Sequence, residues 1–282
     1  MVDRIEKIGG SMIQHGKYSD RVYLIKICKK DYPIIIDKID KLAKLNNYSK
    51  IFIKAPSWAK QGFESNGYKI EAFIPNFYNG IEDAFFMAKY LSTARETISN
   101  QELLDKIIET AKNTEPIKIE GLRLDNDFTF AKLEQKDSKE MSVLYKKVFE
   151  TYPFPIHDPD YVASTMNEDF IYFGIRHNGR LVAVSSCEMD VKSSSVEMTD
   201  FATLPEYRAK GLASFLLMKM ESEMSKKGIK TAFTIARAVS YGMNIAFAKH
   251  KYVYAGTLKN NTNIFGGIES MNVWYKALEG KT

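Results

Sequence analysis

The sequence Thr199-Asp-Phe-Ala-Thr-Leu-Pro-Glu-Tyr-Arg-Ala-Lys-Gly-Leu-Ala-Ser-Phe-Leu-Leu217 predicts a strand, a tight turn and a helix, in that order. The strand begins at Ser195 and is stopped by Pro205, because proline has no N–H for the ladder and fixes its own φ. The helix begins near Gly211, where apolar residues start to recur at spacings of three and four. This stretch therefore predicts a strand that leads directly into a helix, and the rest of the fold is interpreted around it.

The turn within this unit is Arg208-Ala-Lys-Gly-Leu-Ala213, a short run of small and basic residues. Small residues let the backbone approach a ligand closely, and the free N–H groups at a helix start form an anion site. Arg208 and Lys210 add positive charge beside those groups. The turn predicts an anion site, but an ordinary connection with chance basic residues stays open because the motif is short.

The composition limits the class of protein. With 282 residues, 45% hydrophobic and 27% charged, the chain is an ordinary globular protein of one large or two small domains. The net charge of +5 is dispersed, so no nucleic-acid partner is expected. No apolar run approaches the ~18–20 residues that span a membrane, and the N-terminus lacks the core of a signal peptide. We therefore expect a cytoplasmic protein without a membrane partner.

The residue types that bind metals are few and scattered. Cys28 and Cys187 lie far apart without a zinc-ligand spacing, each within an apolar run that predicts a strand. None of the four histidines has a partner at ligand spacing. The sequence therefore predicts no metal site.

The rest of the chain predicts an α/β (α+β mixed sheet) protein in two parts. The first part has expected strands at 20–28, 50–54, 68–77 and 83–91, and helices after Pro33, at 58–65 and at 95–112. The second has expected strands at 128–133, 170–175, 181–187, 195–204, 231–236, 251–258 and 270–276, and helices at 138–150, 211–226 and 241–250. A proline-rich loop at 151–160 should be neither helix nor central strand. The predicted domains are 1–115 and 128–282, joined by a linker at 116–127.

The order of elements in residues 128–278 resembles the GNAT acyltransferase superfamily, whose acetyl-CoA loop reads Arg/Gln-x-x-Gly-x-Gly/Ala after a strand and a proline. The resemblance implies an enzyme in which a deprotonated amine attacks the thioester of acetyl-CoA directly. It places the pyrophosphate on the turn and the pantetheine arm along the strand. The residues assigned to acetyl-CoA in this way are Phe201, Ala202, Thr203, Arg208, Ala209, Lys210, Gly211, Leu212, Ala213, Ser214, Asn244 and Phe247. For Asn244, a plain role in the first turn of its helix stays open.

Two carboxylates are candidates for the catalytic base. Glu197 stands at the offset from the loop where many GNAT enzymes carry a glutamate base, although it also fits a solvated strand residue. A carboxylate with water access can take the proton of an ammonium group of pKa ~10.4 once the site lowers that pKa. Asp200 lies three residues on, so it faces the opposite side of a regular strand. A β-bulge would bring both carboxylates to the same site.

The sequence departs from the family pattern at the residue that would protonate the leaving thiolate. Phe247 stands where many members have a tyrosine that protonates the leaving thiolate, and phenylalanine has no proton to give. Either Tyr241, Tyr252 or Tyr254 substitutes, or the thiolate leaves unassisted, as its pKa of ~8.5 allows.

An internal echo links the two parts. The first part contains Gly67-Tyr68 and then Gly80-Ile-Glu82, and the second contains Lys251-Tyr252 and then Gly267-Ile-Glu269. Coincidence between two closing hairpins is one explanation. The other is that residues 1–115 are a degenerate GNAT-like half, which lacks the acetyl-CoA loop and completes the active site by packing.

The closing hairpins of both parts resemble the β-lysine N6-acetyltransferases, which make the compatible solute Nε-acetyl-β-lysine in osmoadaptation. The resemblance implies a small-molecule diamino acid as acceptor. Its candidate contacts for the amines and the carboxylate are Asp158, Glu188, Asp200, Asn260, Asn261, Asn263 and Glu269. The aliphatic chain would be walled by Tyr152, Phe154 and Trp274. For residues 260–263, a plain polar turn stays open. A protein-lysine or polyamine N-acetyltransferase, a non-catalytic CoA-binding sensor and a homodimer all stay open.

Overall fold

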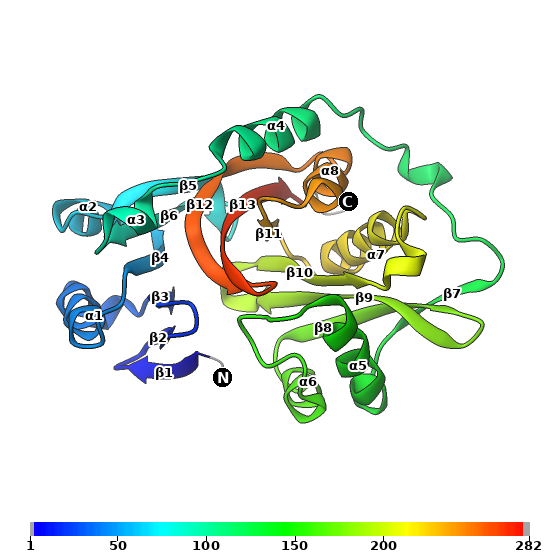
Figure 1. Ribbon diagram of the computed structural model, residues 1–282, viewed down its shortest axis with the longest axis horizontal. Helices are drawn as coiled ribbons and strands as arrows, with labels where there is room; N and C mark the ends of the chain where they lie inside the picture. The colour runs from blue at the N-terminus through cyan, green and yellow to red at the C-terminus, as the bar shows by residue number, and fades with distance from the viewer. Residues whose placement is uncertain (1–2, 279–282) are drawn as a thin grey trace.

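The computed structural model describes residues 3–278, and one sheet of 13 strands runs through them (Figure 1). The first half contains β1 (Arg4–Ile8), β2 (Ser11–Gly16), β3 (Arg21–Lys26), α1 (Ile34–Leu45), β4 (Lys50–Pro56), α2 (Ser57–Ser65), β5 (Lys69–Tyr78), β6 (Glu82–Tyr90), α3 (Thr93–Glu96) and α4 (Gln101–Lys112). The second half contains β7 (Phe128–Lys132), α5 (Ser138–Val148), α6 (Pro159–Thr165), β8 (Phe170–His177), β9 (Arg180–Asp190), β10 (Ser195–Thr203), α7 (Leu212–Lys226), β11 (Thr231–Arg237), α8 (Tyr241–Lys249), β12 (Val253–Ile264) and β13 (Gly267–Ala277). The predicted mixed α/β sheet is confirmed.

Both halves of the sheet repeat one strand order. The order is β1-β2-β3-β4-β6-β5 in the first half and β8-β9-β10-β11-β13-β12 in the second, where β7 adds an edge strand. The third and fourth strands of each series, β3 with β4 and β10 with β11, pair in parallel, and the other pairs within each series are antiparallel. The halves join where β5 meets β12, with Gly256 opposite Ala72.

The echo in the sequence corresponds to one local structure that occurs twice. Gly67 and Lys251 have φ values of 81° and 65°, and each follows the C-cap residue of a helix. The next residue, Tyr68 or Tyr252, donates its N–H to the carbonyl of Phe63 or Phe247, at 3.2 and 3.1 Å. The two tyrosine–phenylalanine ring pairs have the same centroid separation of 5.0 Å. The resemblance of the halves therefore extends to the packing of their second helices.

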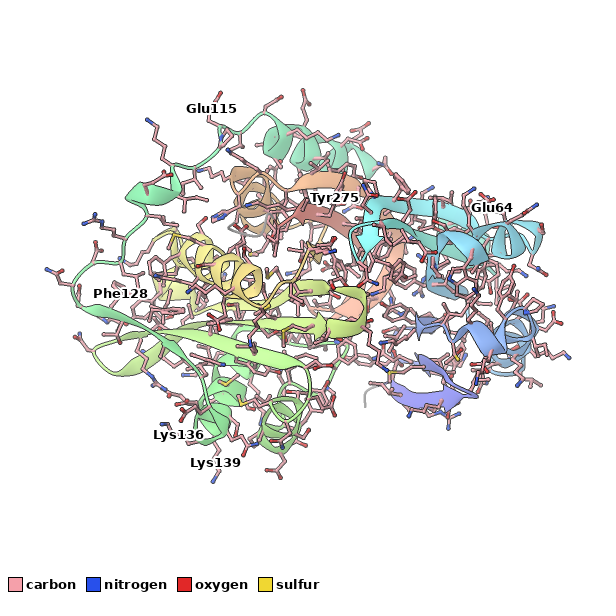
Figure 2. The ribbon with its side chains drawn as sticks, turned by 180° about the vertical axis from the view of Figure 1, so that it is seen from behind. Glu64, Glu115, Phe128, Lys136, Lys139 and Tyr275 are labelled. Carbon is pink, nitrogen blue, oxygen red and sulfur yellow. The ribbon has the colours of Figure 1, made fainter. Side chains whose placement is uncertain are left out.

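Helices pack on both halves of the sheet, and an aromatic inner face lies where the two halves meet. Helices α1 and α2 pack on the first half, while α7 and α8 lie on one side of the second half and α5 and α6 on the other (Figure 1). The inner face brings Phe52 and Phe86 of the first half against Phe233 of the second. The linker runs over the outside of the molecule between Glu115 and Phe128 (Figure 2).

Three local predictions differ from the structure. The hairpin of β1 and β2 was missed because its strands are short and their residues are mixed in polarity. The helix predicted over 95–112 is two helices, α3 and α4, separated at residues 97–100. The proline-rich loop ends in α6, because Pro159 occupies a first-turn position where its missing N–H costs nothing.

Candidate active site

The two parallel strands β10 and β11 separate part-way along their length. They pair only over Ser195–Glu197 and Thr231–Phe233, whereas β10 continues to pair with β9 as far as Thr203. Beyond Glu197 the edge of β10 that faces β11 therefore has no strand partner among the described residues. This open edge is where the sequence places the pantetheine arm, along residues 201–203.

Strand β10 contains the kind of bulge that the sequence analysis considered. The register with β9 shifts between Thr199 and Ala202, and Asp200 takes a φ of 54°. The Asp200 carboxylate accepts hydrogen bonds from the Tyr152 hydroxyl at 2.5 Å and the Ser186 hydroxyl at 2.6 Å. Ser186 shares a face of β9 with Glu188, the residue directly opposite Glu197. The bulge thus brings Asp200 to the side of the sheet that carries Glu197.

Glu188, Glu197 and Asp200 form an acidic cluster, the name used for them below. Burial, followed by the charge of Glu188, raises the pKa of Glu197 to about 8. Burial, followed by the charge of Asp200, raises the pKa of Glu188 to about 7. Burial also raises the pKa of Asp200, although the hydrogen bonds from Ser186 and Tyr152 oppose that rise. The cluster therefore holds protons near neutral pH that isolated carboxyl groups would have lost.

One cation from the first half lies beside the acidic cluster, and the sequence analysis missed it. The Lys54 ammonium on β4 is 5.1 Å from the ring centre of Phe77 and 5.0 Å from that of Phe233. Phe233 is the register partner of Glu197 on β11, so the cation and the carboxylates share the inner face. Burial lowers the pKa of Lys54, while the charges of Glu197 and Glu188 oppose the shift. The one feature of the sequence that could have pointed to Lys54 is the internal repeat, because it predicted that the first half packs on the site.

The glycine turn has the geometry of an anion site. Residues 208–211 are exposed, and Gly211 precedes α7 with a φ of 73°. The first helical hydrogen bond runs from the Phe215 N–H to the Gly211 carbonyl, so the N–H groups of residues 212–214 have no helical acceptor. Open N–H groups at the positive end of a 15-residue helix attract phosphate oxygens.

Asn244 and Trp274 do not fit the roles predicted for them. The Asn244 amide is fully buried; it donates to the carbonyls of Arg237 and Ser240 and accepts from Asn272 and Trp274. Its donors are therefore already used, which leaves none for pantetheine. Trp274 is 1% exposed and points toward α8, away from the inner face, so it cannot form a wall for the acceptor.

Phe247 is fully buried and lies behind Phe201, with their rings edge to face at 5.6 Å. Of the three tyrosines considered as its substitute, Tyr252 is buried against Phe247 on the helix side. The Tyr254 hydroxyl bonds to Thr257, 2.6 Å away. Tyr241, in the first turn of α8, is the most exposed of the three, at 38%.

Some of the predicted acceptor contacts lie at the site, whereas others cap a helix or form ion pairs elsewhere. Tyr152 reaches Asp200, and Phe154 packs at the edge of the main core. Asp158 is exposed and caps α6 by accepting the Asp160 N–H at 3.0 Å, and Glu269 forms a two-point ion pair with Arg237 at 2.6 and 2.8 Å.

The asparagines of β12 tie the two halves together instead of joining the acidic cluster. The Asn260 amide donates to the carbonyls of Arg95 and Thr97, and the Asn263 amide donates to that of Tyr18. Asn261 accepts a hydrogen bond from the Arg21 guanidinium on its main-chain carbonyl, while its side-chain oxygen is buried without a partner among residues 3–278. The side-chain contacts of Asn260 and Asn263 correct the expectation that these two residues face the acceptor.

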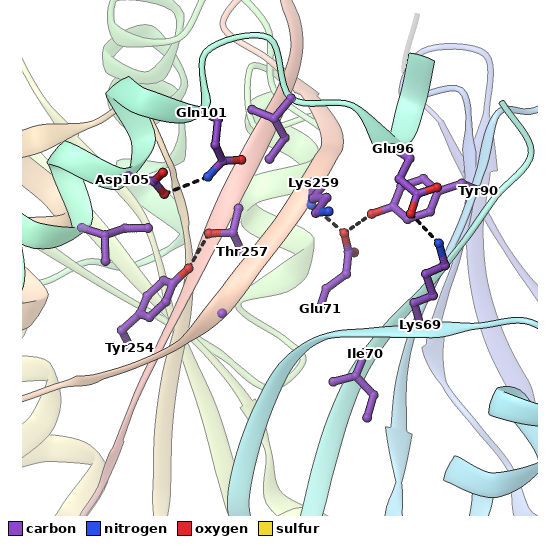
Figure 3. A pocket seen from close by; sticks show the side chains of 13 residues that line it. Lys69, Ile70, Glu71, Tyr90, Glu96, Gln101, Asp105, Tyr254, Thr257 and Lys259 are labelled. Carbon is purple, nitrogen blue, oxygen red and sulfur yellow. Dashed lines mark hydrogen bonds and ion pairs between the residues drawn. The ribbon is translucent and has the colours of Figure 1, made fainter. Parts of the chain in front are cut away.

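A separate pocket of about 340 Å³ lies where β5 and β12 diverge, under α3 and α4 (Figure 3). Several of its charged groups have partners: Lys69 pairs with Glu96 at 2.6 Å, and Asp105 accepts a hydrogen bond from Gln101 at 2.8 Å. Glu71 accepts a hydrogen bond from the Tyr90 hydroxyl. Most of the charged groups that line this pocket are therefore already bonded within the chain.

Over residues 3–278, no group of three or more His, Cys, Asp or Glu side chains is placed to hold a metal ion. Within the same residues, no helix is both long enough and apolar enough to cross a membrane.

The comparisons with known proteins agree with this geometry. The model of the Acetyltransferase (GNAT) family matches residues 138–261. A β-lysine N(6)-acetyltransferase of Methanococcus maripaludis is 41% identical over 99% of this chain and 100% of its own length. The N-acetyltransferase YodP of Bacillus subtilis is 36% identical over 95% of this chain and 96% of its own. A β-lysine N(6)-acetyltransferase of Methanosarcina mazei is 33% identical over 84% and 94%. The chain belongs to the GNAT acetyltransferase family and is an N-acetyltransferase.

Proposed function

We propose that this protein transfers the acetyl group of acetyl-CoA to N6 of β-lysine (3,6-diaminohexanoate), which yields a compatible solute. Two relatives that match nearly all of their length carry this activity in their names, at 41% and 33% identity. The acidic cluster carries the proposal on the structural side, because three carboxylates on one inner face suit an acceptor with two ammonium groups. A neutral acceptor would leave those charges without partners.

Acetyl-CoA fits the open edge of β10 and the turn before α7. The N–H groups of residues 212–214 and the charges of Arg208 and Lys210 suit a pyrophosphate. The backbone of residues 201–203 offers unpaired groups to an amide-bearing arm. Acetyl-CoA supplies a thioester, and the net exchange forms an N–C bond at the amine and releases a free thiol.

Glu197 acts as the general base in this proposal. It lies where β10 and β11 separate, and its pKa of about 8 lies closer to that of an amine than the ordinary carboxyl pKa does. The closer match lowers the cost of taking a proton from the bound ammonium. Asp200, held by Tyr152 and Ser186, fixes the ammonium by charge, since its two hydrogen bonds set the direction of the carboxylate.

The first half is, in this proposal, a shortened GNAT-like copy that binds no CoA. Its counterpart of the glycine turn, between β3 and α1, contains Asp31. The Asp31 carboxylate accepts the Gly10 N–H and the Ser11 hydroxyl, and the bond from Ser11 lowers its pKa. A fixed negative charge at that place repels a pyrophosphate. The copy instead supplies the wall opposite the acidic cluster.

The test is an acetylation assay on the purified protein with acetyl-CoA. β-Lysine, α-lysine, spermidine and a lysine-containing peptide are compared by release of free thiol, and the acetylated nitrogen is identified by NMR. We expect the highest kcat/KM with β-lysine and acetylation at N6. No thiol release with any free amine would overturn the proposal, and a preference for the peptide would assign the site to proteins instead.

A further inference from the structure

Among the described residues of the first half, four cations are buried or partly buried on the side of the second half, and three of them are hydrogen-bonded to it. Arg21 donates to the carbonyl of Asn261, Lys50 to that of Lys259, and Arg95 to that of Asn260. All three acceptors are on β12, so these cations hold the two halves together. The fourth cation is Lys54, for which no ion pair within 4.0 Å and no hydrogen bond is found among residues 3–278.

The position of Lys54 is fixed by packing, not by a charged partner. Its ammonium lies beside the rings of Phe77 and Phe233, at 5.1 and 5.0 Å from their centres. An aromatic face attracts a cation but leaves its three N–H groups free to donate to a ligand. Lys54 is partly exposed, and the two rings hold its side chain in place.

The carboxylates beside Lys54 need more positive charge than it provides. Glu188 and Glu197 are directly opposite each other on neighbouring antiparallel strands, an arrangement in which like charges repel. The other charges that face Lys54 are Asp190, which Lys26 already pairs at 3.0 Å, and Lys26 itself. Bound β-lysine would bring two ammonium groups to the acidic cluster and one carboxylate, for which Lys54 is the unpaired cation at hand.

We propose that the Lys54 ammonium binds the carboxylate of the acceptor, so that this residue of the first half selects a diamino acid over a diamine. The inference rests on the proposed function and names the residue that sets its substrate class. Binding energy from Lys54 is available to an acceptor with a carboxylate and unavailable to one without it. The first half then contributes to recognition, while the second half carries the acetyl donor and the base.

The experiment compares β-lysine with pentane-1,4-diamine, which is the same chain without the carboxylate. Both are assayed with wild-type protein and with Lys54→Met, on the high-pH plateau of each pH profile, where the loss of a neighbouring cation no longer changes the ionisation of Glu197. We expect Lys54→Met to lower kcat/KM for β-lysine by about 10- to 100-fold, mainly through KM, as for loss of a charge-assisted hydrogen bond. For the diamine we expect a change of less than about threefold.

Lys60→Met is the matched control, because Lys60 pairs with Glu64 on the outer helix α2. Lys60→Met should leave kcat/KM unchanged for both substrates. Circular dichroism with thermal unfolding shows whether each variant folds. Lys54→Arg should recover part of the discrimination, since it restores a cation. If Lys54→Met lowers kcat/KM equally for both substrates, or lowers it for neither, the inference is wrong while the proposed function stands. If wild-type protein does not acetylate β-lysine, the proposed function itself fails.

Discussion

Replacing Glu197 by glutamine tests the base and the charge balance of the site together. Glutamine keeps the shape of the side chain and removes its ability to accept a proton from the acceptor ammonium. Loss of a general base lowers kcat by about 10²- to 10⁴-fold. The wild-type rise of kcat/KM with pH, which we place near the Glu197 pKa of about 8, should disappear in the variant.

The same substitution should stabilise the protein at high pH. Because the pKa of Glu197 is about 8 in the folded protein and near its ordinary 4.5 in the unfolded chain, the folded state binds more protons between those values. Wild-type stability therefore falls as pH rises from about 5 through 8. One unit of pKa shift corresponds to about 1.4 kcal/mol, and part of the shift is shared with Glu188, so we expect a gain of at least about 1 kcal/mol for the variant at pH 9. Near pH 4 the two proteins should differ little.

The assay combines thiol release over pH 6 to 10 with thermal unfolding at pH 5 and pH 9. A gain of ~1 kcal/mol raises the melting temperature of a protein of this size by roughly 2 °C. The reasoning is refuted if the variant keeps wild-type kcat on the plateau, because Glu197 is then not the base. It is also refuted if the variant is less stable than wild type at pH 9, because the burial and like-charge argument then has the wrong sign.

Three further perturbations follow from individual contacts. Gly211→Ala meets open space but forces alanine to a φ of 73°, which costs about 1–2 kcal/mol, and steady-state kinetics should show a raised KM for acetyl-CoA with little change for β-lysine. Tyr152→Phe removes a hydrogen bond that lowers the pKa of Asp200, so Asp200 should lose its charge at higher pH than in wild type and KM for β-lysine should rise on the acid side of the profile; an unchanged KM there would contradict a role for Asp200. Lys50→Met leaves Glu71 buried without its partner and should cost about 3–5 kcal/mol by urea unfolding, and adding Glu71→Gln should restore most of it.

The elements that sequence patterns predict well here are those with strong local signals. The strand before Pro205, the turn at Gly211 and the helix α7 follow from chain stops and apolar spacing, and the structure has all three. The bulge at Asp200 was considered only as the geometry that would bring Asp200 and Glu197 together, because no local pattern distinguishes a bulged strand from a regular one. The hairpin of β1 and β2 has few apolar residues, and its pairing depends on the neighbouring β3.

The acceptor side of the site was harder to predict, because its residues come from strands that are distant in sequence. Asn260 and Glu269 looked like ligands by residue type alone, but their partners, Arg95 and Arg237, take up their polar groups in the folded chain. Residue type identifies which groups can bind a ligand. Only the folded structure shows which of them are already bound to the protein.

The internal repeat relates the two sides of the site residue by residue. Ala88 and Tyr275 lie at the same distance along their strands from Glu82 and Glu269, and their register partners are Phe52 and Phe233. The partners of those phenylalanines on the next strand are Tyr23 and Glu197. The first half thus has Tyr23 at the position that Glu197 occupies in the second.

The same register matches Lys54 with Ile235, through their partners Phe86 and Val273. A cation in the first half therefore replaces an apolar residue of the second, and it faces the carboxylates of the second half. In the first half, a tyrosine stands at the position of Glu197, the counterpart of the glycine turn contains Asp31, and Lys54 places a positive charge on the inner face. These differences are what the proposed roles require, in which the first half recognises the acceptor and the second half binds the donor and supplies the base.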